Sequence, residues 1–507
     1  MNLSSQAQHD VNTVAKGAAT QVLGQICART VLFFFTIAAA NLLNAAGFGR
    51  YRKVGQVLGV AAQVGLAGFH YAALRFISRA RATGDLGGVR GAARTAIAGA
   101  TIISVIVGLL LLLGADILAV HFSETSEGAT DFARLIRIGV PYIPALALMQ
   151  VLRYCTQAYK TMVPSVIVGD VVQPLVRAVV GVTVLVLGFG VTGAVTSLVF
   201  SMSVGAAVGA WYYVRILTQD ERAASPHAEP TAMVKFAFPQ AGTTLLGIRA
   251  LGLPVLMLGV LGTDRDVALF AVALALQGPG ELALSGMVDI WAPVVSDLHS
   301  RGDIERLASL YKTITRWIAT FSLPVYAALM IKPDLFVKFF GSGYPQAATV
   351  VAILAVGNAF HSVAGPAVFV LSMTGRPGVN FVISLSAVLL YLGLGIAVVP
   401  DHGIIGMAVV DAVVTVLVSS TRVAVAHALV GIQPLGRSLV KPAAATVIGA
   451  AVLLSWDWLT IDSILIDSAG LVVASLTYLG VLRLLGLDSE ERYVWERVRL
   501  RISRPRL

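Results

Sequence analysis

The sequence predicts an all-α, polytopic membrane protein with about fourteen transmembrane helices. Of its 507 residues, 57% are hydrophobic and only 13% are charged, whereas a soluble globular chain carries about 25% charged residues. Apolar stretches of roughly 20 residues, the length that crosses about 30 Å of hydrocarbon, recur along most of the chain. Basic residues also gather in alternate loops between these stretches. A soluble domain is therefore excluded.

The apolar stretches define the predicted spans, which lie near 22–46, 54–77, 94–120, 132–156, 163–188, 191–214, 236–261, 267–293, 307–330, 347–371, 378–400, 403–430, 438–456 and 464–486. The first twenty residues are polar and small, so we expect no cleavable signal peptide. Cys27 and Cys155 both fall inside predicted spans, where a free cysteine is expected to act as a small apolar residue rather than as a redox or metal-binding group.

The net charge of +10 is distributed as membrane topology requires. Twenty-four basic residues fall on the side of the two termini, against six on the other side, and those six include Arg50, Arg52 and Lys53 ahead of the second span. The positive-inside rule therefore places both termini in the cytoplasm, and no nucleic-acid partner is expected. The segment 488–507 is predicted to be either a basic helix on the inner leaflet or a solvated tail.

An internal repeat divides the chain. Ser78–Asp85 matches Ser296–Asp303 with an offset of 218 residues, and Pro164, Gly190 and Gly193 match Pro377, Gly403 and Gly406 with an offset of 213. These matches indicate two copies of a six-span unit followed by two further spans. Because six is even, the copies have the same orientation, so they are parallel repeats related by an axis along the membrane normal.

The repeat predicts a division of the chain into five parts. They are an N-terminal lobe at 1–216, a cytoplasmic linker at 217–234, a C-terminal lobe at 235–432, two extra spans at 433–486 and a basic cytoplasmic tail at 487–507. Two parallel lobes with a cleft between them are the architecture that alternating access requires.

Arg29 and Arg249 are candidate substrate-binding residues. They lie in spans one and seven with an offset of 220 residues, close to the repeat offset. Equivalent positions in two lobes would face each other across the cleft, where guanidinium groups bind phosphate oxygens through paired hydrogen bonds. Pairing of each arginine within its own lobe is the alternative, because a charge inside a bilayer is costly without a partner.

Arg153, Asp170 and Arg177 are predicted to form a structural ion-pair cluster between spans four and five. Asp170 and Arg177 are seven residues apart, which places them on one helix face. The alternative is that Asp170 is a protonatable coupling residue.

Glu281 and Asp289 are coupling candidates in the eighth span. Glu281 follows Gly278-Pro279-Gly280, a sequence expected to break the helix and expose backbone to a cavity. The two acids would bind a coupling cation or neutralise Arg249, and Asp289 could also lie at the cytoplasmic interface. His70 is a further coupling candidate, as a proton relay, although a packing role is the alternative.

The sequence resembles the polysaccharide-biosynthesis flippases, the oligosaccharide-exporting branch of the MOP superfamily of multidrug, oligosaccharidyl-lipid and polysaccharide exporters, which have a MATE-like fold. The matching stretches are Gly47–Tyr51, Leu74–Arg79 with Gly84-Asp85, Pro293 with Gly302-Asp303 and Leu310–Lys312, Phe340-Gly341 with Tyr344, and Gly403–Gly406. The resemblance implies a two-lobe fold of fourteen helices, alternating access, and a polyprenyl-diphosphate-linked oligosaccharide as cargo for lipopolysaccharide or exopolysaccharide biosynthesis.

This resemblance also implies a location in the bacterial cytoplasmic (inner) membrane. The expected partners are the lipid-linked oligosaccharide, membrane lipids and the polysaccharide polymerase machinery. A cation-coupled multidrug antiporter and a lipid II flippase are the alternatives within the fold. Enzyme activity is not expected, because the longest outer segment, 331–346, contains only one acid, Asp334. No catalytic residue, metal or cofactor is predicted, and coupling to H⁺ or Na⁺ is left open.

Overall fold

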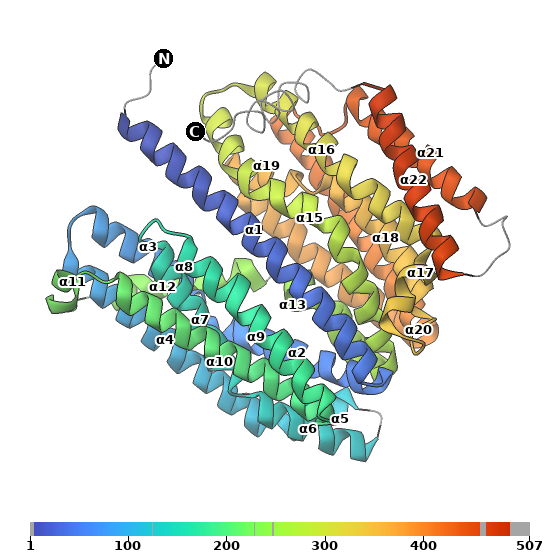
Figure 1. The fold of residues 1–507 in the computed structure, drawn as a ribbon. Coiled ribbons are helices and arrows are strands. Elements are labelled where there is room, and N and C mark those ends of the chain that lie inside the picture. Colours follow the sequence, from blue (N-terminus) through green and yellow to red (C-terminus); the bar gives the residue numbers. More distant parts are fainter. Residues whose placement is uncertain (1–4, 124, 228, 246–247, 457–462, 487–507) are drawn as a thin grey trace, which may run out of the picture. The chain divides into compact units, whose positions relative to one another are not determined.

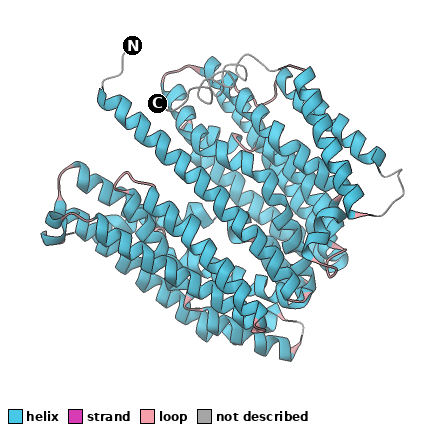
Figure 2. Ribbon diagram, in the orientation of Figure 1, coloured by secondary structure: helices cyan, strands magenta, loops and turns pink. Residues whose placement is uncertain are grey.

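The computed structural model describes residues 5–123, 125–227, 229–245, 248–456 and 463–486. Every regular element in this part of the chain is a helix, which confirms the all-α fold (Figure 2). The elements, labelled in Figure 1, are α1 Ser5–Leu42, α2 Ala45–Leu66, α3 Phe69–Ala82, α4 Leu86–Leu113, α5 Ala115–Phe122, α6 Ser126–Gly139, α7 Tyr142–Gln157, α8 Val163–Val166, η1 Ile167–Val172, α9 Gln173–Val186, α10 Gly190–Ile216, α11 Gln219–Ala223, α12 Pro230–Leu245, α13 Ile248–Leu251, α14 Leu253–Leu261, α15 Asp264–Ser300, α16 Ile304–Ile331, α17 Pro333–Val337, η2 Lys338–Phe340, α18 Ala347–Ala364, α19 Ala367–Met373, α20 Pro377–Val430, η3 Arg437–Leu439, α21 Val440–Ser455 and α22 Ile464–Leu484.

Twelve stretches of the described residues are long and apolar enough to cross a membrane. One of them, α20, contains two predicted spans, because the chain reverses at Gly403, where φ is 54°. The Tyr391 hydroxyl donates to Asp411 at 3.0 Å across this reversal, although the two residues would lie about 30 Å apart along a straight helix. The predicted seventh span corresponds to α12, α13 and α14, none of which is long enough by itself. The twelve stretches, the second span within α20 and the interrupted seventh span together account for the fourteen expected spans.

The chain forms two compact units. Unit 1 comprises Met1–Gly278, Val337–Val350 and Gly378–Val414, and unit 2 comprises Pro279–Phe336, Val351–Pro377 and Thr415–Leu507. The lobe boundaries that the sequence predicts, at residues 216 and 235, stay predictions. The predicted inner-leaflet helix at 488–507 lies outside the described residues.

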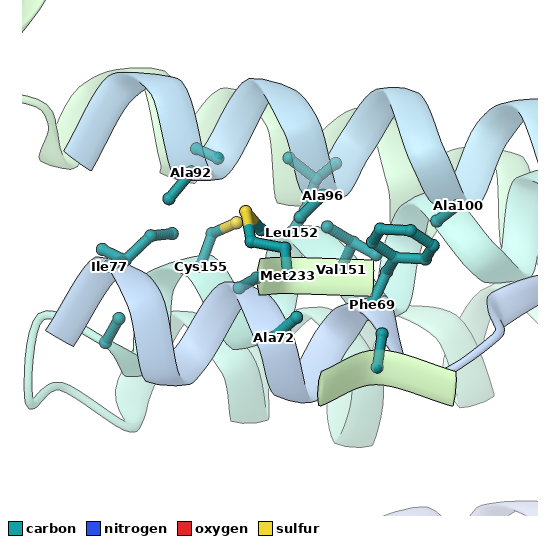
Figure 3. Close-up of a cluster of buried hydrophobic side chains, with 14 of the residues drawn as sticks. Phe69, Ala72, Ile77, Ala92, Ala96, Ala100, Val151, Leu152, Cys155 and Met233 are labelled. Atoms are coloured by element: carbon teal, nitrogen blue, oxygen red, sulfur yellow. The ribbon is translucent and has the colours of Figure 1, made fainter. Parts of the chain in front are cut away.

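The core of unit 1 is built where α3, α4, α7 and α12 meet. Ala72, Ala96 and Cys155 are fully buried there, and Met233 of α12 points toward Cys155 and Leu152 (Figure 3). Small side chains let these helices approach closely, which is how helices associate when lipid removes the hydrophobic driving force between them. Cys155 has the small apolar role expected from the sequence.

The core of unit 2 is built around Trp291 of α15. Its ring stacks on Tyr311 with centroids 5.6 Å apart, and its Nε1 donates to the carbonyl of Pro366 at 3.3 Å. Helices α21 and α22 join this unit through α16, since the Tyr478 hydroxyl donates to the carbonyl of Thr320 at 2.6 Å. The two C-terminal spans are therefore a structural part of unit 2.

Large apolar side chains cover much of the exterior of the spans. Leu113 of α4 and Leu465 of α22 are each 78% exposed. Soluble monomers rarely expose such continuous apolar surface, whereas lipid chains solvate it. The chain is a multi-pass membrane protein.

The two repeats share local backbone geometry. Gly84 and Gly302 both have φ of 72°, and Gly190 and Gly403 have φ of 55° and 54°. The residue after the first pair is an aspartate in both repeats: Asp85 caps α4 by accepting from the Gly88 amide, and Asp303 caps α16 by accepting from the Arg306 amide. The same turn and cap thus recur at the offsets that the sequence predicts.

The linker after α10 is attached to unit 1. Its short helix α11 begins with a capping box formed by Thr218 and Glu221, and Glu221 also accepts from the Tyr159 hydroxyl at 3.0 Å. Further along, the His227 amide donates to the Gly87 carbonyl at 3.3 Å, and the His227 ring lies 3.0 Å from Asp85. The linker therefore packs on the start of α4 and on Tyr159, which follows α7.

Candidate functional site

A polar cluster joins α1, α7 and η1 inside the membrane-spanning part of unit 1. The Arg153 guanidinium lies 3.3 Å from the Asp170 carboxylate, and its Nε donates to the Ser165 carbonyl at 3.0 Å. Gln21 of α1 donates to the same carboxylate at 3.3 Å. Both charged side chains are only 13% exposed, so the pair is largely removed from solvent.

The backbone around Asp170 is a π-helical turn, η1, rather than an α-helix. Single π-helical turns within α-helices are uncommon and occur often at functional sites. Gly169 belongs to this turn, and any side chain at Gly169 would overlap the Arg153 guanidinium. The sequence therefore places a residue without a side chain where the cation approaches the backbone.

The expectation that Arg177 joins this cluster is wrong. Arg177 donates instead to the Tyr51 hydroxyl at 2.7 Å, and its guanidinium lies 5.5 Å from the Phe35 ring centre. The reason is the π-helical turn between Asp170 and Arg177, because its wider i→i+5 turn changes the angular spacing that a seven-residue separation has in an α-helix.

His70 is buried among aromatic rings in α3. Its ring lies 4.0 Å from that of Tyr71 and 4.7 Å from that of Tyr154, measured between centres. Its Nδ1 is shielded from solvent and has no hydrogen-bond partner among the described residues. This environment fits the packing alternative, and a role of His70 in proton transfer stays a prediction.

The structure describes the side chain of only one of the two predicted substrate-binding arginines. Arg29 lies on the exposed side of α1, next to the buried Ala28. The backbone of Arg249 belongs to α13, but its side chain lies outside the described residues. Whether the two arginines face each other is therefore still a prediction.

The expected helix break at Gly278-Pro279-Gly280 is wrong, since α15 continues from Asp264 to Ser300. Packing explains the continuity. The Ser322 hydroxyl of α16 donates to the Gly280 carbonyl at 2.7 Å, and a side chain at Gly280 would overlap the Tyr326 ring. Proline weakens a helix through a lost hydrogen bond and a clash, but it is tolerated inside transmembrane helices.

Of the two candidate acids in α15, the structure describes the side chain of Glu281 only. Glu281 is half-buried and takes part in an interaction, so it is not a free carboxylate. The side chain of Asp289 lies outside the described residues. Coupling roles for both stay predictions. Among the described residues, no group of three His, Cys, Asp or Glu is placed to hold a metal ion.

Sequence reasoning missed a charged cluster at the opposite end of unit 1. Arg50 of α2 lies 3.0 Å from Asp131 and 3.1 Å from Asp264, while Lys53, which is 1% exposed, pairs with Asp264 and donates to the Phe122 carbonyl at 2.6 Å. These contacts connect the first repeat with Asp264, which begins the eighth span.

Arg52 is also missed, because the second span begins earlier than its hydropathy indicates. Helix α2 starts at Ala45, and the spanning stretch covers Ala45–Ala82. Arg52 and Lys53 are therefore parts of helix α2 and not of a loop. The N-cap signal of Asn44, whose side chain accepts from the Gly47 amide at 2.7 Å, would have given the correct start.

The sequence was compared with families of known proteins. It matches the family described as polysaccharide biosynthesis protein over residues 14–299, which is more than half of the chain. The chain belongs to this family. A search of curated proteins finds no match.

The structure of this chain is similar to several solved structures. An inward-facing MATE multidrug transporter of the MOP superfamily has a TM-score of 0.68 and 16% identity, covering 81% of this chain and 98% of its own. The lipid II flippase MurJ has a TM-score of 0.71 and 12% identity, with coverages of 91% and 98%. A MOP superfamily transporter from Pyrococcus furiosus has a TM-score of 0.58 and 15% identity, with coverages of 82% and 96%. At these identities the likeness establishes the fold.

Proposed function

We propose that this polysaccharide biosynthesis protein is a flippase that moves a polyprenyl-diphosphate-linked oligosaccharide across the bacterial cytoplasmic membrane by alternating access. The observation that carries the proposal is the family match over residues 14–299. The fold shared with a lipid II flippase supports it, because that protein transports a lipid-linked cargo. The proposed partners are this cargo, membrane lipids and the polymerase machinery that extends the glycan.

Charges in the spans support an anionic cargo. In the N-terminal half of the chain, Arg29, Arg52 and Arg177 lie in the spans. Two acids in these spans, Asp170 and Asp131, are already paired with Arg153 and Arg50. A diphosphate needs such cations, and a cationic drug would be repelled by them. Arg29 and Arg249 remain the proposed substrate-binding residues of the central cleft.

Coupling to H⁺ or Na⁺ is part of the proposal, with Asp170, Glu281, Asp289 and His70 as its candidate residues. Asp170 is the best supported of these, because it lies on a π-helical turn and is paired with Arg153. Protonation of Asp170 would break this ion pair. The protein is proposed to act without catalysis of a covalent step, and both of its termini are proposed to lie in the cytoplasm.

The test is transport in proteoliposomes. A short polyprenyl diphosphate carrying a fluorescent oligosaccharide would be incorporated with the purified protein, and an external glycosidase would cleave the glycan only on outward-facing molecules. In vesicles with the protein, we expect the fraction of glycan that resists the external glycosidase to fall below about half. In protein-free vesicles this fraction is expected to stay unchanged. Arg29→Ala and Arg249→Ala are expected to abolish the difference.

Three further arms separate the alternatives. Lipid II in place of the oligosaccharide lipid, an unglycosylated polyprenyl diphosphate, and a cationic dye with an imposed pH or Na⁺ gradient would be offered to the same vesicles. Movement of lipid II alone would identify a lipid II flippase, and export of the dye alone would identify a multidrug antiporter. Either result would refute the proposed cargo.

A further inference from the structure

A cluster of charged side chains joins the two predicted repeats at one end of unit 1. Lys53 of α2 is fully buried, pairs with Asp264 in the first turn of α15, and donates to the Phe122 carbonyl at 2.6 Å. Arg50, one turn earlier on α2, lies 3.1 Å from Asp264 and 3.0 Å from Asp131. Two cations of the first repeat therefore hold one carboxylate of the second.

The face of α2 that carries Lys53 also contacts the backbone of the second repeat. Gly49, Lys53 and Gln56 follow each other at i, i+4 and i+7, so they lie on one face of the helix. A side chain at Gly49 would overlap the Asp264 carbonyl, and the Gln56 side chain donates to the Leu251 carbonyl at 3.0 Å. The second repeat therefore covers this face of α2.

The end of α1 receives a third segment of the second repeat. The Tyr344 hydroxyl donates to the Ala40 carbonyl at 2.9 Å, and the Asn41 side chain donates to the Phe339 carbonyl at 3.1 Å. Tyr344 also packs edge-on against Phe48 of α2, with ring centres 6.3 Å apart. Three separate segments of the second repeat thus dock on residues 40–56, which we call the α1–α2 corner.

The charges of the cluster balance, and its rim reaches solvent. Arg50 and Lys53 are matched by Asp264, whose side chain is 17% exposed, and by Asp131, whose side chain is 49% exposed. Attraction between buried charges offsets their desolvation cost only when the geometry is good, and the net gain in stability is small. Water at the rim can hydrate the same groups once they separate. The cluster therefore fixes one closed arrangement and can still release it.

The proposed topology places the α1–α2 corner on the outer side of the membrane. The distribution of basic residues assigns Arg50 and the segment 331–346 to that side. Alternating access requires the two repeats to separate there before the cargo can leave. The closed corner is thus a contact that has to break in each transport cycle.

We propose that Asp264, held by Lys53 and Arg50, is the latch of an outer gate between the two repeats. With Asp264 bound to both cations the outer end is closed. When Asp264 leaves them, water hydrates the three charges and the outer end opens. The role of this gate in export rests on the proposed function, whereas the latch itself is defined by the contacts of Asp264.

The gate is tested by the rate at which an impermeant maleimide reaches a cysteine behind the latch. Gln56→Cys, one turn beyond Lys53 on α2, is made in full-length protein in which Cys27 is replaced, and intact cells are labelled from outside. Adding Asp264→Asn is expected to speed this labelling at least about tenfold, the change expected for loss of one charge-assisted contact. Labelling of Ser126→Cys serves as the reference and is expected to be equal with and without Asp264→Asn.

Two further variants make the test specific to the latch. Arg50→Gln leaves the Lys53–Asp264 pair in place, so it is expected to speed labelling less than Asp264→Asn does. Arg137→Gln is the matched control, because Arg137 pairs with Asp116 inside the first repeat, and it is expected to leave the rate unchanged. If Asp264→Asn does not accumulate, Arg50→Gln decides: a rate equal to that of the parent protein would overturn the proposal.

An apolar replacement separates a latch from a purely structural contact. Lys53→Met with Asp264→Leu removes both charges while keeping side chains of similar size, and such replacement of a buried pair is often neutral or stabilising. Because apolar groups resist hydration, the gate is expected to stay closed. Glycan transport should then be lost, with labelling behind the latch as slow as in the parent. Full transport by this variant would overturn the proposal.

The labelling rate does not depend on the cargo, so the two proposals fail separately. A wild type that moves no glycan but shows labelling controlled by Asp264 would refute the flippase and leave the gate. Unchanged labelling in Asp264→Asn and Arg50→Gln, with normal movement of glycan, would refute the gate and leave the flippase.

Discussion

Arg153 and Asp170 show how one residue pair can be tested for a structural or a coupling role. Their side chains are 13% exposed and 3.3 Å apart. Removing one member of such a buried pair leaves an uncompensated charge, which costs about 3–5 kcal/mol. We therefore expect Arg153→Gln to lower stability by this amount in a detergent unfolding measurement.

The double variant is the decisive member of this set. Arg153→Gln with Asp170→Asn should recover much of the lost stability, because neither charge remains. If the pair is only structural, the double variant also keeps its transport. A stable double variant that has lost its response to a pH or Na⁺ gradient would instead assign coupling to Asp170.

Asp85 gives a prediction about pH at the linker. The Gly88 amide, followed by the neighbouring His227, holds the pKa of Asp85 below its usual range. A carboxyl group with a lowered folded-state pKa stabilises the fold above its unfolded pKa of about 3.9, and this contribution is lost as the pH falls through the folded-state pKa. We expect a spin label at Ser225, on the exposed linker, to be immobilised at pH 6 and to become mobile below about pH 4.

Asp85→Asn is the control for this titration. Asparagine keeps an oxygen that can accept from the Gly88 amide, so the cap remains while the charge is removed. The label should then show the same mobility at both pH values. A wild-type transition that persists in Asp85→Asn would show that another group controls the linker.

Residue roles were harder to predict than residue environments. The sequence indicated that intramembrane arginines need partners, and Arg153 is paired with Asp170. It could not show that Arg177 turns to Tyr51, because the π-helical turn that redirects it has no signature in hydropathy. Arg52 was assigned to a loop because three basic residues within four positions, from Arg50 to Lys53, lowered the apparent start of the span.

At the scale of elements, helices α2 and α15 approach each other closely at Gly49 of α2. A methyl group there would overlap the Asp264 carbonyl and crowd the Ala268 amide, both in the first turns of α15. Backbone cannot move aside as a flexible side chain can. We expect Gly49→Ala to cost about 1–3 kcal/mol of stability, as overpacking usually does, and to lower the melting temperature in detergent.

Gly55 provides a matched control on the same helix. A methyl group at Gly55 meets nothing within 4 Å, and alanine is a better helix former than glycine. Gly55→Ala should therefore leave the melting temperature unchanged or raise it. Equal losses in the two variants would mean that the helix, rather than the contact with α15, tolerates no substitution.

Element prediction failed where tertiary contacts decide the outcome. Gly278-Pro279-Gly280 is a strong local signal for a break, yet α15 continues through it, and Ser322 and Tyr326 of α16 pack against Gly280. Local propensity is a weak guide when a neighbouring helix supplies the missing contacts. By contrast, Pro164 and Pro377 do lie at helix starts, where proline costs nothing.

At the scale of the whole molecule, topology can be measured directly. The excess of basic residues on the side of the termini predicts that Ser126 and Ser463 face outward and that Ser225 faces the cytoplasm. Single cysteines at these positions should react with an impermeant maleimide accordingly, from outside for the first two and only after lysis for the third. Cys27 is exposed and should be replaced first, whereas the buried Cys155 can stay. Labelling of a cysteine at position 225 in intact cells would show that the orientation is the reverse of the predicted one.

The fold as a whole was predictable because membrane spans follow from length and hydropathy. Fourteen spans and an all-α fold agree with the structure, once the reversal within α20 and the interrupted seventh span are counted. The domain division follows from contacts and not from hydropathy. Compact units depend on which helices touch, and α12, which begins within the predicted linker, packs with α3 and α4 of the first repeat.

The paired glycines carry a consequence for how the two halves of this chain have diverged. Gly84 and Gly302, like Gly190 and Gly403, adopt backbone angles that favour an achiral residue. At other positions a duplicated segment can exchange one side chain for another of similar size, and the sequence similarity between the two copies is lost. The backbone conformation disfavours such exchange at these four positions. The similarity of the two repeats is therefore retained at glycines whose backbone adopts a left-handed conformation.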